Sequence, residues 1–228
     1  RNAELDQFAY VASHDLKAPL RAISNLAEWL GEDLGNQLPP ENQRQLELLR
    51  SRVDRMEALI NGLLEYSRVG RRQRSTVAVD LNDLLSNVVD SLAPPQSFTV
   101  DLPSDLPTLY SHKTALGQVF ANLINNAIKH HHRDRGTVRV SWRDRGKWLE
   151  FAVSDDGPGI APQYHDKIFT IFQTLKARDD FESTGVGLAV VKKIIEAEKG
   201  RVWLTSTLGE GTTFYFTWPF TQTPPVQD

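Results

Sequence analysis

The sequence predicts a helical hairpin followed by an α/β sandwich, in which one sheet is covered on one face by helices. Apolar residues recur at steps of three or four in residues 5–34 and again in residues 46–63. A break that contains glycine and two prolines separates these stretches, and strand-like segments alternate with helical ones from residue 77 onward. A length of 228 residues is compatible with two modest domains of this kind.

Composition narrows the class of protein. A hydrophobic fraction of 40%, a charged fraction of 24% and a net charge of −3 are typical of a globular protein and indicate neither nucleic acid nor an anionic membrane as a partner. The absence of cysteine excludes disulfides, thiolate catalysis and cysteine-ligated metals, and is compatible with the cytoplasm. Because the chain starts without Met or a signal-peptide pattern, we expect it to be part of a longer cytoplasmic protein.

The hairpin is expected to span residues 1–70. The apolar stripe of its first helix consists of Leu5, Phe8, Ala12, Leu16, Leu20, Ile23, Ala27, Leu30 and Leu34, and that of its second helix of Leu46, Leu49, Val53, Met56, Ile60 and Leu63. Two helices cannot enclose both stripes, so we predict a homodimer in which two hairpins form a four-helix bundle. The alternative is that the hairpin packs against the rest of its own chain. Pro19 is expected to bend the first helix.

Residues 71–76 are expected to form a polar, basic linker, with the mixed α/β domain at 77–220 and a Pro-rich tail at 221–228. The arginines of the linker lack the interleaved aromatic residues of a nucleic-acid site, so a solvated hinge is the preferred interpretation. Strands are predicted at 77–79, 137–142, 148–153, 201–205 and 212–218, and helices at 82–92, 111–131, 162–172 and 186–198. Ser111 is the expected N-cap of the second of these helices.

The segment DDGPG, residues 155–159, directly follows a predicted strand. The carboxylate of Asp155 can accept a hydrogen bond from an exocyclic amine, and Gly157 and Gly159 let the backbone bend closely around a flat ring. Alternatively, the segment is only a tight turn.

The segment STGVGL, residues 183–188, precedes a predicted helix. Glycines at a helix N-terminus expose backbone N–H groups to a phosphate, at the positive end of the helix dipole. A simple glycine-containing helix cap is the alternative interpretation.

A third segment, NLINNAIK at residues 122–129, lies within a predicted helix. Asn122, Asn126 and Lys129 are spaced at i, i+4 and i+7, which places them on one face. Amide oxygens can ligate Mg²⁺, and a lysine can neutralise phosphate charge. The alternative is an ordinary polar outer face.

Three consecutive histidines, 130–132, invite a metal interpretation. Successive helical residues point about 100° apart, so three such rings do not converge on one ion. We expect them to lie at a helix C-terminus instead, where positive charge suits the dipole.

These segments, taken in order, resemble the boxes of the sensor histidine kinase family over nearly the whole chain. FAYVASHDLKAPLR at 8–21 resembles the phosphoacceptor box, residues 122–129 the N box, residues 155–160 the first glycine box and residues 183–188 the second. IFTIFQ at 168–173 is similar to the F box, and GEGTTF at 209–214 to the last glycine-rich turn. The residues of the phosphoacceptor box are most similar to those of bacteriophytochrome-type and related cytoplasmic sensor kinases.

The resemblance implies a dimerisation and histidine-phosphotransfer hairpin, then an ATP-binding domain of the fold shared with gyrase and chaperone ATPases. It implies autophosphorylation of His14, transfer to an aspartate in a response regulator receiver domain, and a sensor domain upstream in the full-length protein. His14 lies two residues from Ala12 and from Leu16, so its ring is expected to face away from the apolar stripe. Asp15 is expected to fix the tautomer of the imidazole and to stabilise it as the N–P bond forms.

The resemblance also implies a site for ATP and Mg²⁺. In this site Asp155 contacts the adenine amine, Asn126 ligates Mg²⁺ with help from Asn122, and Arg178 meets the γ-phosphate. The implied nucleotide-binding residues are Asn122, Asn126, Lys129, His130, Asp155, Gly157, Gly159, Ile160, Phe172, Arg178, Thr184, Gly185, Val186, Gly187, Leu188 and Thr212.

Three positions depart from the family pattern. Ala18 replaces a Thr or Asn that positions water for dephosphorylation of the partner, so we expect weak phosphatase activity. Ser183 replaces a glycine, which we expect to stiffen the lid. Asp156 replaces an Asn and adds charge near the nucleotide.

Two other functions are compatible with parts of the pattern. A gyrase- or chaperone-type ATPase shares the nucleotide boxes but has no use for the His14 box. A catalytically degenerate dimeric scaffold is less consistent with the sequence, because every expected catalytic residue type is present.

Overall fold

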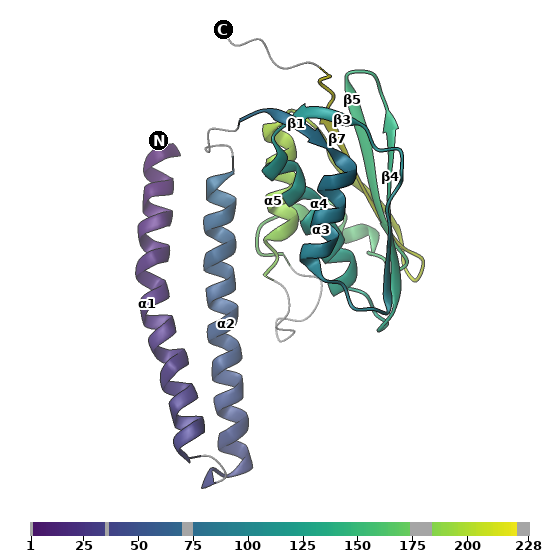
Figure 1. The fold of residues 1–228 in the computed structure, drawn as a ribbon. Helices are drawn as coiled ribbons and strands as arrows, with labels where there is room; N and C mark the ends of the chain where they lie inside the picture. Colours follow the sequence, from purple (N-terminus) through teal and green to yellow (C-terminus); the bar gives the residue numbers. More distant parts are fainter. Residues whose placement is uncertain (1, 35–36, 70–74, 174–183, 223–228) are drawn as a thin grey trace. The chain divides into compact units, whose positions relative to one another are not determined.

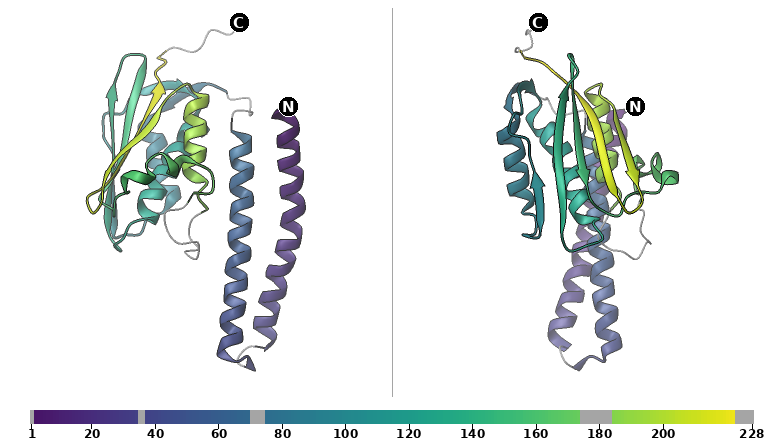
Figure 2. Two further views of the ribbon diagram at one scale, coloured as in Figure 1. Left: turned by 180° about the vertical axis from the view of Figure 1, so that it is seen from behind. Right: turned by 90° about the vertical axis from the view of Figure 1, so that its right-hand side faces the viewer.

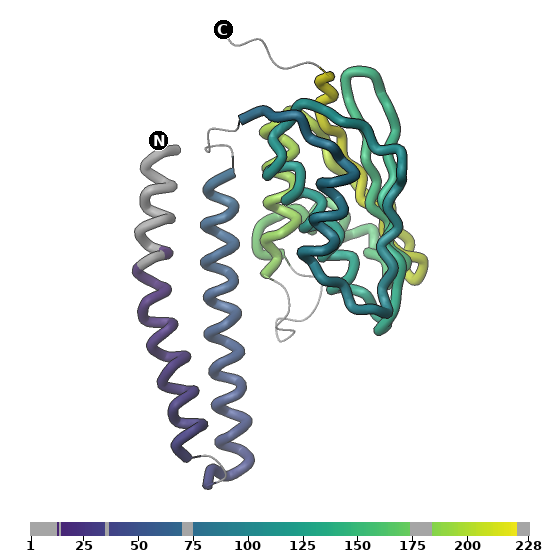
Figure 3. Tube along the Cα trace, viewed as in Figure 1, coloured from purple at the N-terminus to yellow at the C-terminus, as the bar shows by residue number. Residues whose placement is uncertain are grey.

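The computed structural model describes residues 2–34, 37–69, 75–173 and 184–222, and the path of the chain is traced in Figure 3. Within the first helix, the side chains of residues 2–12 and of His14 lie outside this description. Most of the predicted linker and of the predicted tail also lie outside it. The chain divides into two compact units, residues 1–68 with 172–186 and residues 69–171 with 187–228, and each is described by itself.

The hairpin consists of α1 (Asn2–Leu34) and α2 (Pro40–Arg68), as the three–four periodicity predicts. Leu20 and Ala27 of α1 are buried, as are Val53 and Leu64 of α2. Pro19 lies inside α1, and the bend expected there stays a prediction. None of the helices in the described part of the chain has a stretch apolar and long enough to cross a bilayer.

The second unit is an α/β sandwich, as predicted, and its elements are labelled in Figure 1. Its helices are α3 (Leu81–Leu92), α4 (Lys113–Lys129) and α5 (Gly187–Ala197), with 3₁₀ turns η2 (Pro162–Tyr164) and η3 (Lys167–Phe169). Its strands are β1 (Val77–Asp80), β2 (Phe98–Asp101), β3 (Thr108–Ser111), β4 (Gly136–Asp144), β5 (Trp148–Asp155), β6 (Val202–Thr207) and β7 (Gly211–Pro219).

The main sheet has five strands in the order β2-β4-β5-β7-β6. The β2–β4 pair is parallel and the other pairs are antiparallel, while β1 and β3 form a separate two-stranded antiparallel sheet. Helices α4 and α5 contact the main sheet and each other, and α3 contacts α4. Figure 2 shows these helices on one face of the sheet, with the opposite face left open.

Three phenylalanines form the centre of the core between α4 and the sheet. Phe120 of α4 meets Phe151 and Phe216 edge-on, at ring-centroid distances of 5.2 and 5.3 Å, and the latter two rings stack at 5.1 Å. Each of them is fully buried. Burial of one such side chain contributes about 1.5–3 kcal/mol, so this cluster fixes α4 firmly on the sheet.

Helix α3 begins at Leu81, one residue before the predicted start, because Asp80 caps it. Its Oδ1 accepts hydrogen bonds from the backbone N–H groups of Asn82 at 2.8 Å and Asp83 at 3.3 Å. A cap of this type contributes about 1 kcal/mol.

The predicted N-cap of α4 is wrong. Ser111 belongs to strand β3 and lies one residue before the observed cap position. Ser111 ends β3, and its buried hydroxyl accepts a hydrogen bond from the indole Nε1–H of Trp218 at 2.8 Å. Because that hydroxyl is already bonded to the core, it is not used as a helix cap, and His112 occupies the cap position without a side-chain cap bond.

The predicted helix at 162–172 is also wrong. The segment forms the two short 3₁₀ turns η2 and η3, and Thr170 after the second turn is extended, which prevents a continuous helix. Strands β2 and β3, with four residues each, were not predicted from the sequence. The other predicted strands and helices are confirmed to within a few residues.

Candidate functional site

The turn after β5 surrounds a half-buried carboxylate. Asp155 is the last residue of β5 and pairs with Thr212 of β7. Its Oδ1 accepts hydrogen bonds from the backbone N–H groups of Gly157 at 2.9 Å and Thr212 at 3.3 Å. Among the described residues, both of these bonds end on Oδ1, so Oδ2 can accept a bond from a ligand.

Burial raises the pKa of Asp155 above its usual 3.8, and the two backbone hydrogen bonds oppose part of that rise. The ionised form is therefore partly desolvated, and an additional N–H donor from a ligand would stabilise it. This arrangement fits the exocyclic amine that the sequence assigned to Asp155.

Glycine is required at two positions around this carboxylate. Gly159 has φ +72°, and a Cβ placed there would lie 2.1 Å from the carbonyl oxygen of Thr207. Gly211 has φ +112°, and its Cβ would lie 2.0 Å from the carbonyl oxygen of Asp155. The turn is thus packed directly against the β6–β7 hairpin, which the bond from the Gly209 N–H to the Pro158 carbonyl at 2.8 Å also fastens.

Two side chains that the sequence analysis missed hold Ile160 in place. The Ile160 N–H donates to Ser206 Oγ at 2.7 Å, and that oxygen also lies 2.9 Å from the buried hydroxyl of Thr212. His165 Nε2 donates to the carbonyl of Ile160 at 2.9 Å. No sequence signal marks Ser206 or His165, because both act through a residue more than four positions away.

Helix α4 carries the predicted polar residues beside a buried apolar face. Leu123, Ile124 and Ala127 are buried, whereas Asn122 and Asn126 are only half-buried. Lys129 is exposed in the last turn of the helix, and His130 follows as its C-cap. Asn122, Asn126 and Lys129 therefore lie on one rigid helix, with His130 at its C-cap. Such an arrangement suits the binding of an anion or of Mg²⁺.

Helix α5 begins beside this face. A Cβ on Gly187, its first residue, would lie 3.3 Å from Oδ1 of Asn122, which leaves little room for any side chain there. The N-terminus of α5, the positive end of its helix dipole, thus lies next to the amides of α4. Leu188, next on α5, is half-buried.

The second glycine box up to Val186 belongs to the compact unit that contains the hairpin. The Phe172 N–H donates to the Gly185 carbonyl at 2.9 Å, and both residues have φ of +66°. A Cβ on Gly185 would lie 2.5 Å from the carbonyl oxygen of Gln173. Thr184 and Val186 flank this glycine, and Arg178 lies outside the described residues.

The predicted phosphoacceptor His14 lies in α1, but its side chain is outside the described part of the chain, so its predicted exposure stays a prediction. Asp15 is exposed on the same helix. In the described ranges, no group of three or more His, Cys, Asp or Glu side chains could hold a metal ion.

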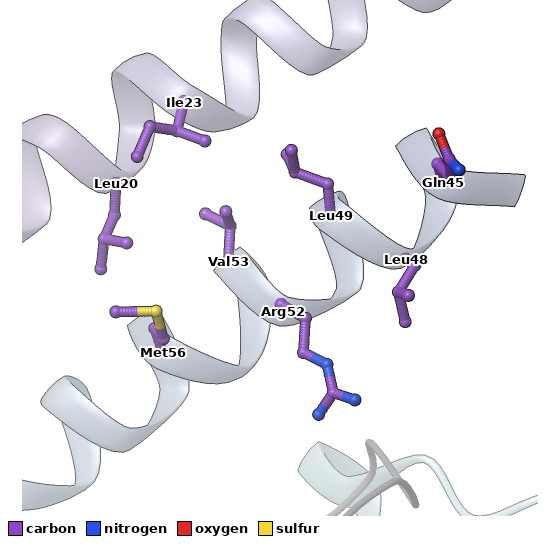
Figure 4. Close-up of a pocket in the computed structure, with 8 residues that line it drawn as sticks. All are labelled: Leu20, Ile23, Gln45, Leu48, Leu49, Arg52, Val53 and Met56. Atoms are coloured by element: carbon purple, nitrogen blue, oxygen red, sulfur yellow. The ribbon is translucent and has the colours of Figure 1, made fainter. Parts of the chain in front are cut away.

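An apolar groove of about 490 Å³ lies between α1 and α2, and its lining is shown in Figure 4. Its lining residues are Leu20, Ile23, Gln45, Leu48, Leu49, Arg52, Val53 and Met56. The groove contains none of the predicted nucleotide-binding residues. It is an opening in the hairpin that apolar side chains from both helices line.

Comparison with known protein families divides the chain in the same order. Residues 4–72 match the family described as "His Kinase A (phospho-acceptor) domain". Residues 111–222 match the family described as "Histidine kinase-, DNA gyrase B-, and HSP90-like ATPase".

Similar proteins are longer than this chain. Cyanobacterial phytochrome A from Nostoc sp. is 41% identical over 223 residues, which cover 96% of this chain but 29% of the phytochrome. The adaptive-response sensory kinase SasA from Synechococcus sp. is 32% identical over 94% of this chain and 59% of its own length. Among solved structures, full-length ShkA in complex with AMPPNP has a TM-score of 0.70 and 27% identity, covering 96% of this chain and 47% of ShkA.

The two left-handed glycines Gly159 and Gly146 provide a matched test of the packed turn. Gly146 has φ +77° and nothing within 4 Å of its Cβ position, so Gly146→Ala is expected to lower the unfolding free energy by about 1 kcal/mol through strain alone. Gly159→Ala adds the overlap with the Thr207 carbonyl and is expected to cost about 3 kcal/mol. Chemical denaturation of the whole chain measures both, and equal losses would contradict the packing described.

The raised pKa of Asp155 predicts a pH dependence for adenine-nucleotide binding. The ligand amine needs an ionised acceptor, so ADP affinity should fall as the pH falls through the raised pKa, earlier than for an ordinary aspartate. The stability of the ligand-free protein changes in the opposite sense. Its free energy of unfolding should rise as the pH falls through this pKa, because protonation removes the cost of a desolvated charge. Calorimetric titration with ADP from about pH 7 to about pH 4 measures this. In Asp155→Asn, binding should be weak and should lose this dependence.

Proposed function

Because this chain belongs to the sensor histidine kinase family, we propose that it is a kinase core that phosphorylates its own His14 with ATP. It then passes the phosphoryl group to an aspartate of a response regulator in two-component signalling. The observation that carries the proposal is the order of the two matches, a phosphoacceptor domain at 4–72 directly before an ATPase domain at 111–222. We assign residues 1–70 to dimerisation and phosphotransfer, 71–76 to a linker, 77–220 to ATP binding and 221–228 to a tail.

Asp155 is assigned to the adenine, since Oδ2 of its half-buried carboxylate can accept from the exocyclic amine. The glycines at 157 and 159 and the side chains of Ile160 and Thr212 shape that pocket. The phosphates are assigned to the other end of the site, where α5 begins beside the amides of α4.

Asn126 is assigned as a ligand of Mg²⁺, with Asn122 beside it, and Lys129 and His130 as contacts of the phosphates. Bound Mg²⁺ neutralises phosphate charge and orients the leaving group. Half-buried amide oxygens on a rigid helix fit this ion, which prefers oxygen ligands. We assign Phe172 and residues 184–188 to the wall around the nucleotide, and Arg178 to charge on the γ-phosphate.

In the phosphoryl transfer, one ring nitrogen of His14 forms the N–P bond as the bond from the γ-phosphorus to the ADP oxygen breaks. Asp15 accepts a hydrogen bond from the other ring N–H, which fixes the tautomer and stabilises the positive charge that develops on the ring. Positioning and electrostatics supply the catalysis, because no base is needed to activate water.

We propose that the hairpin dimerises into a four-helix bundle. Large apolar side chains remain exposed on the stripes of both helices: Leu16, Ile23, Leu30, Leu34, Leu49 and Met56 are each at least 38% exposed. The groove in Figure 4 opens along the same stripes. A second hairpin would cover this surface, which a lone hairpin leaves in water.

The partners follow from the reaction. The phosphohistidine needs a receiver aspartate, and the ThkA histidine kinase, whose fold matches with a TM-score of 0.61 at 21% identity, was solved in complex with the response regulator TrrA. This chain spans 29% of the phytochromes it matches, so we propose a sensor domain upstream of it. We place its action in the cytoplasm, where ATP and the response regulators are available.

Two alternatives remain distinct from this proposal. A gyrase- or chaperone-type ATPase would release phosphate without forming an acid-labile, alkali-stable phosphoprotein. A degenerate scaffold would bind nucleotide without phosphorylation. The match at residues 4–72 disfavours the first alternative, since it has no use for a phosphoacceptor domain.

His14→Gln should abolish labelling of the protein by radiolabelled ATP, because the side-chain amide is not a nucleophile. ADP affinity should remain within about twofold of wild type, since the residue belongs to the other domain. The label on wild-type protein should be lost in acid and kept in alkali. Retained labelling of the variant would show that another residue accepts the phosphoryl group.

Ala18 predicts weak phosphatase activity, because a methyl group cannot hold an attacking water. Ala18 is exposed on α1, four residues after His14. Ala18→Thr should therefore raise dephosphorylation of the phosphorylated cognate regulator by about tenfold or more, with autophosphorylation little changed. Ala18→Ser and Ala18→Val serve as the hydroxyl-bearing and hydroxyl-free controls. Rapid dephosphorylation by the wild-type protein would contradict the prediction.

A further inference from the structure

The side chain of His131 is buried, although the residue as a whole is half-buried and the sequence suggested a surface residue at a helix end. It lies two positions beyond Lys129, the last residue of α4, and its side chain is only 2% exposed. Its ring meets Phe98 edge-on at 5.4 Å and stacks on His132 at 5.0 Å. Packing on both sides therefore fixes the orientation of the ring.

The buried ring is bonded to the carboxylate that follows Asp155 in the chain. His131 Nε2 lies 3.2 Å from Oδ1 of Asp156, which also accepts from the Thr137 N–H at 2.7 Å. The Thr137 bond and, more weakly, the His131 bond lower the pKa of Asp156 against the opposing effect of burial. Asp156 is thus a carboxylate that can only accept, so Nε2 carries the proton and donates it.

The other ring nitrogen ties the same residue back to its own loop. Nδ1 lies 3.1 Å from the backbone nitrogen of Arg133, whose N–H it accepts when Nε2 alone carries the ring proton, and also 3.1 Å from the Arg133 carbonyl oxygen. The imidazole is therefore bonded on one side to the loop after α4 and on the other to the turn that holds Asp155.

These bonds connect the two ends of the nucleotide site. Helix α4 carries the amide face assigned to Mg²⁺ and phosphate, and the turn carries the carboxylate assigned to adenine. A nucleotide that spans both ends requires a fixed separation between them, and a buried ring with bonds at both nitrogens is stiffer than a solvated loop.

We propose that His131 is a positioning residue that sets the adenine turn relative to α4 through its bond to Asp156. The inference rests on the proposed function, in which Asp155 receives the adenine. Loss of the bond should loosen ground-state binding of the nucleotide, which raises KM for ATP while kcat stays nearly constant. It also gives a defined role to Asp156, the carboxylate that stands where the family pattern has an Asn.

The variants His131→Phe, His131→Gln and His132→Phe, made in the whole chain, test the proposal. Phe keeps a ring in the pocket but cannot donate to Asp156, and should weaken ADP binding about three- to tenfold. Gln can donate again and should recover most of the affinity. His132 stacks on His131 and is exposed, so His132→Phe is the matched control and should bind ADP within about twofold of wild type.

Calorimetric titration with ADP is the first readout, and KM and kcat of autophosphorylation are the second. A double-mutant cycle with Asp156→Ala is the third: the losses from His131→Phe and Asp156→Ala should overlap rather than add. The cycle built with His131→Gln in place of Phe gives the same comparison if the Phe variant does not fold. Additive losses, or an equal loss in His132→Phe, would overturn the proposal.

Asp155→Asn separates this inference from the proposed function. If Asp155→Asn weakens ADP binding and His131→Phe does not, the positioning role is wrong and the proposed function stands. If wild-type protein and Asp155→Asn bind ADP equally, the adenine assignment fails, and the positioning role fails with it.

Discussion

The desolvated carboxylate of Asp155 is the constraint around which one end of the α/β domain is built. Removing an ionised group from water costs several kcal/mol unless hydrogen bonds replace the lost hydration. The N–H of Gly157 supplies one such bond within the turn itself, and the N–H of Thr212 supplies a second because Asp155 pairs with Thr212 of β7. That close approach leaves no space for a Cβ at Gly159 or Gly211. Glycines of two separate boxes are therefore required by the same close packing around the half-buried Asp155.

At the other end of the proposed site, the position of the α4 amides depends on how this helix packs in the core. Helix α4 presents its amides on one face because Phe120 and its neighbours fix the opposite face against the sheet. A helix held in this way keeps Asn122 beside the start of α5, so the groups that we propose for phosphate binding are arranged before a ligand arrives. The exposed stripes of the hairpin have the opposite character. Several of their large apolar residues stay exposed in the described hairpin, which favours the proposed pairing with a second hairpin.

Much of this architecture is readable from the sequence because its signals are local. Periodicity at three or four residues located α1 and α2, and alternation located β4, β5 and β7 to within a few residues. The order of the boxes predicted the two domains in the order in which the family comparisons found them. Asp155, Gly157 and Gly159 of the turn after β5 were recognised in this way, because the box is a short continuous segment in which spacing reflects geometry, whereas Ser206 and His165, which bond Ile160, were not.

Tertiary structure decided what depends on partners distant in the chain. Ser111 has the residue type of a helix cap, but its hydroxyl accepts a hydrogen bond from Trp218, 107 residues away. Helix α4 therefore begins without a cap bond from Ser111. The sequence placed His131 on a helix surface, whereas Phe98 and Asp156, the latter 25 residues away, bury its ring and bond it. The physical reason is the same in both cases. A side chain has a fixed set of hydrogen-bonding groups, and which of them a local motif can use is settled only when the fold brings the competing partner within reach.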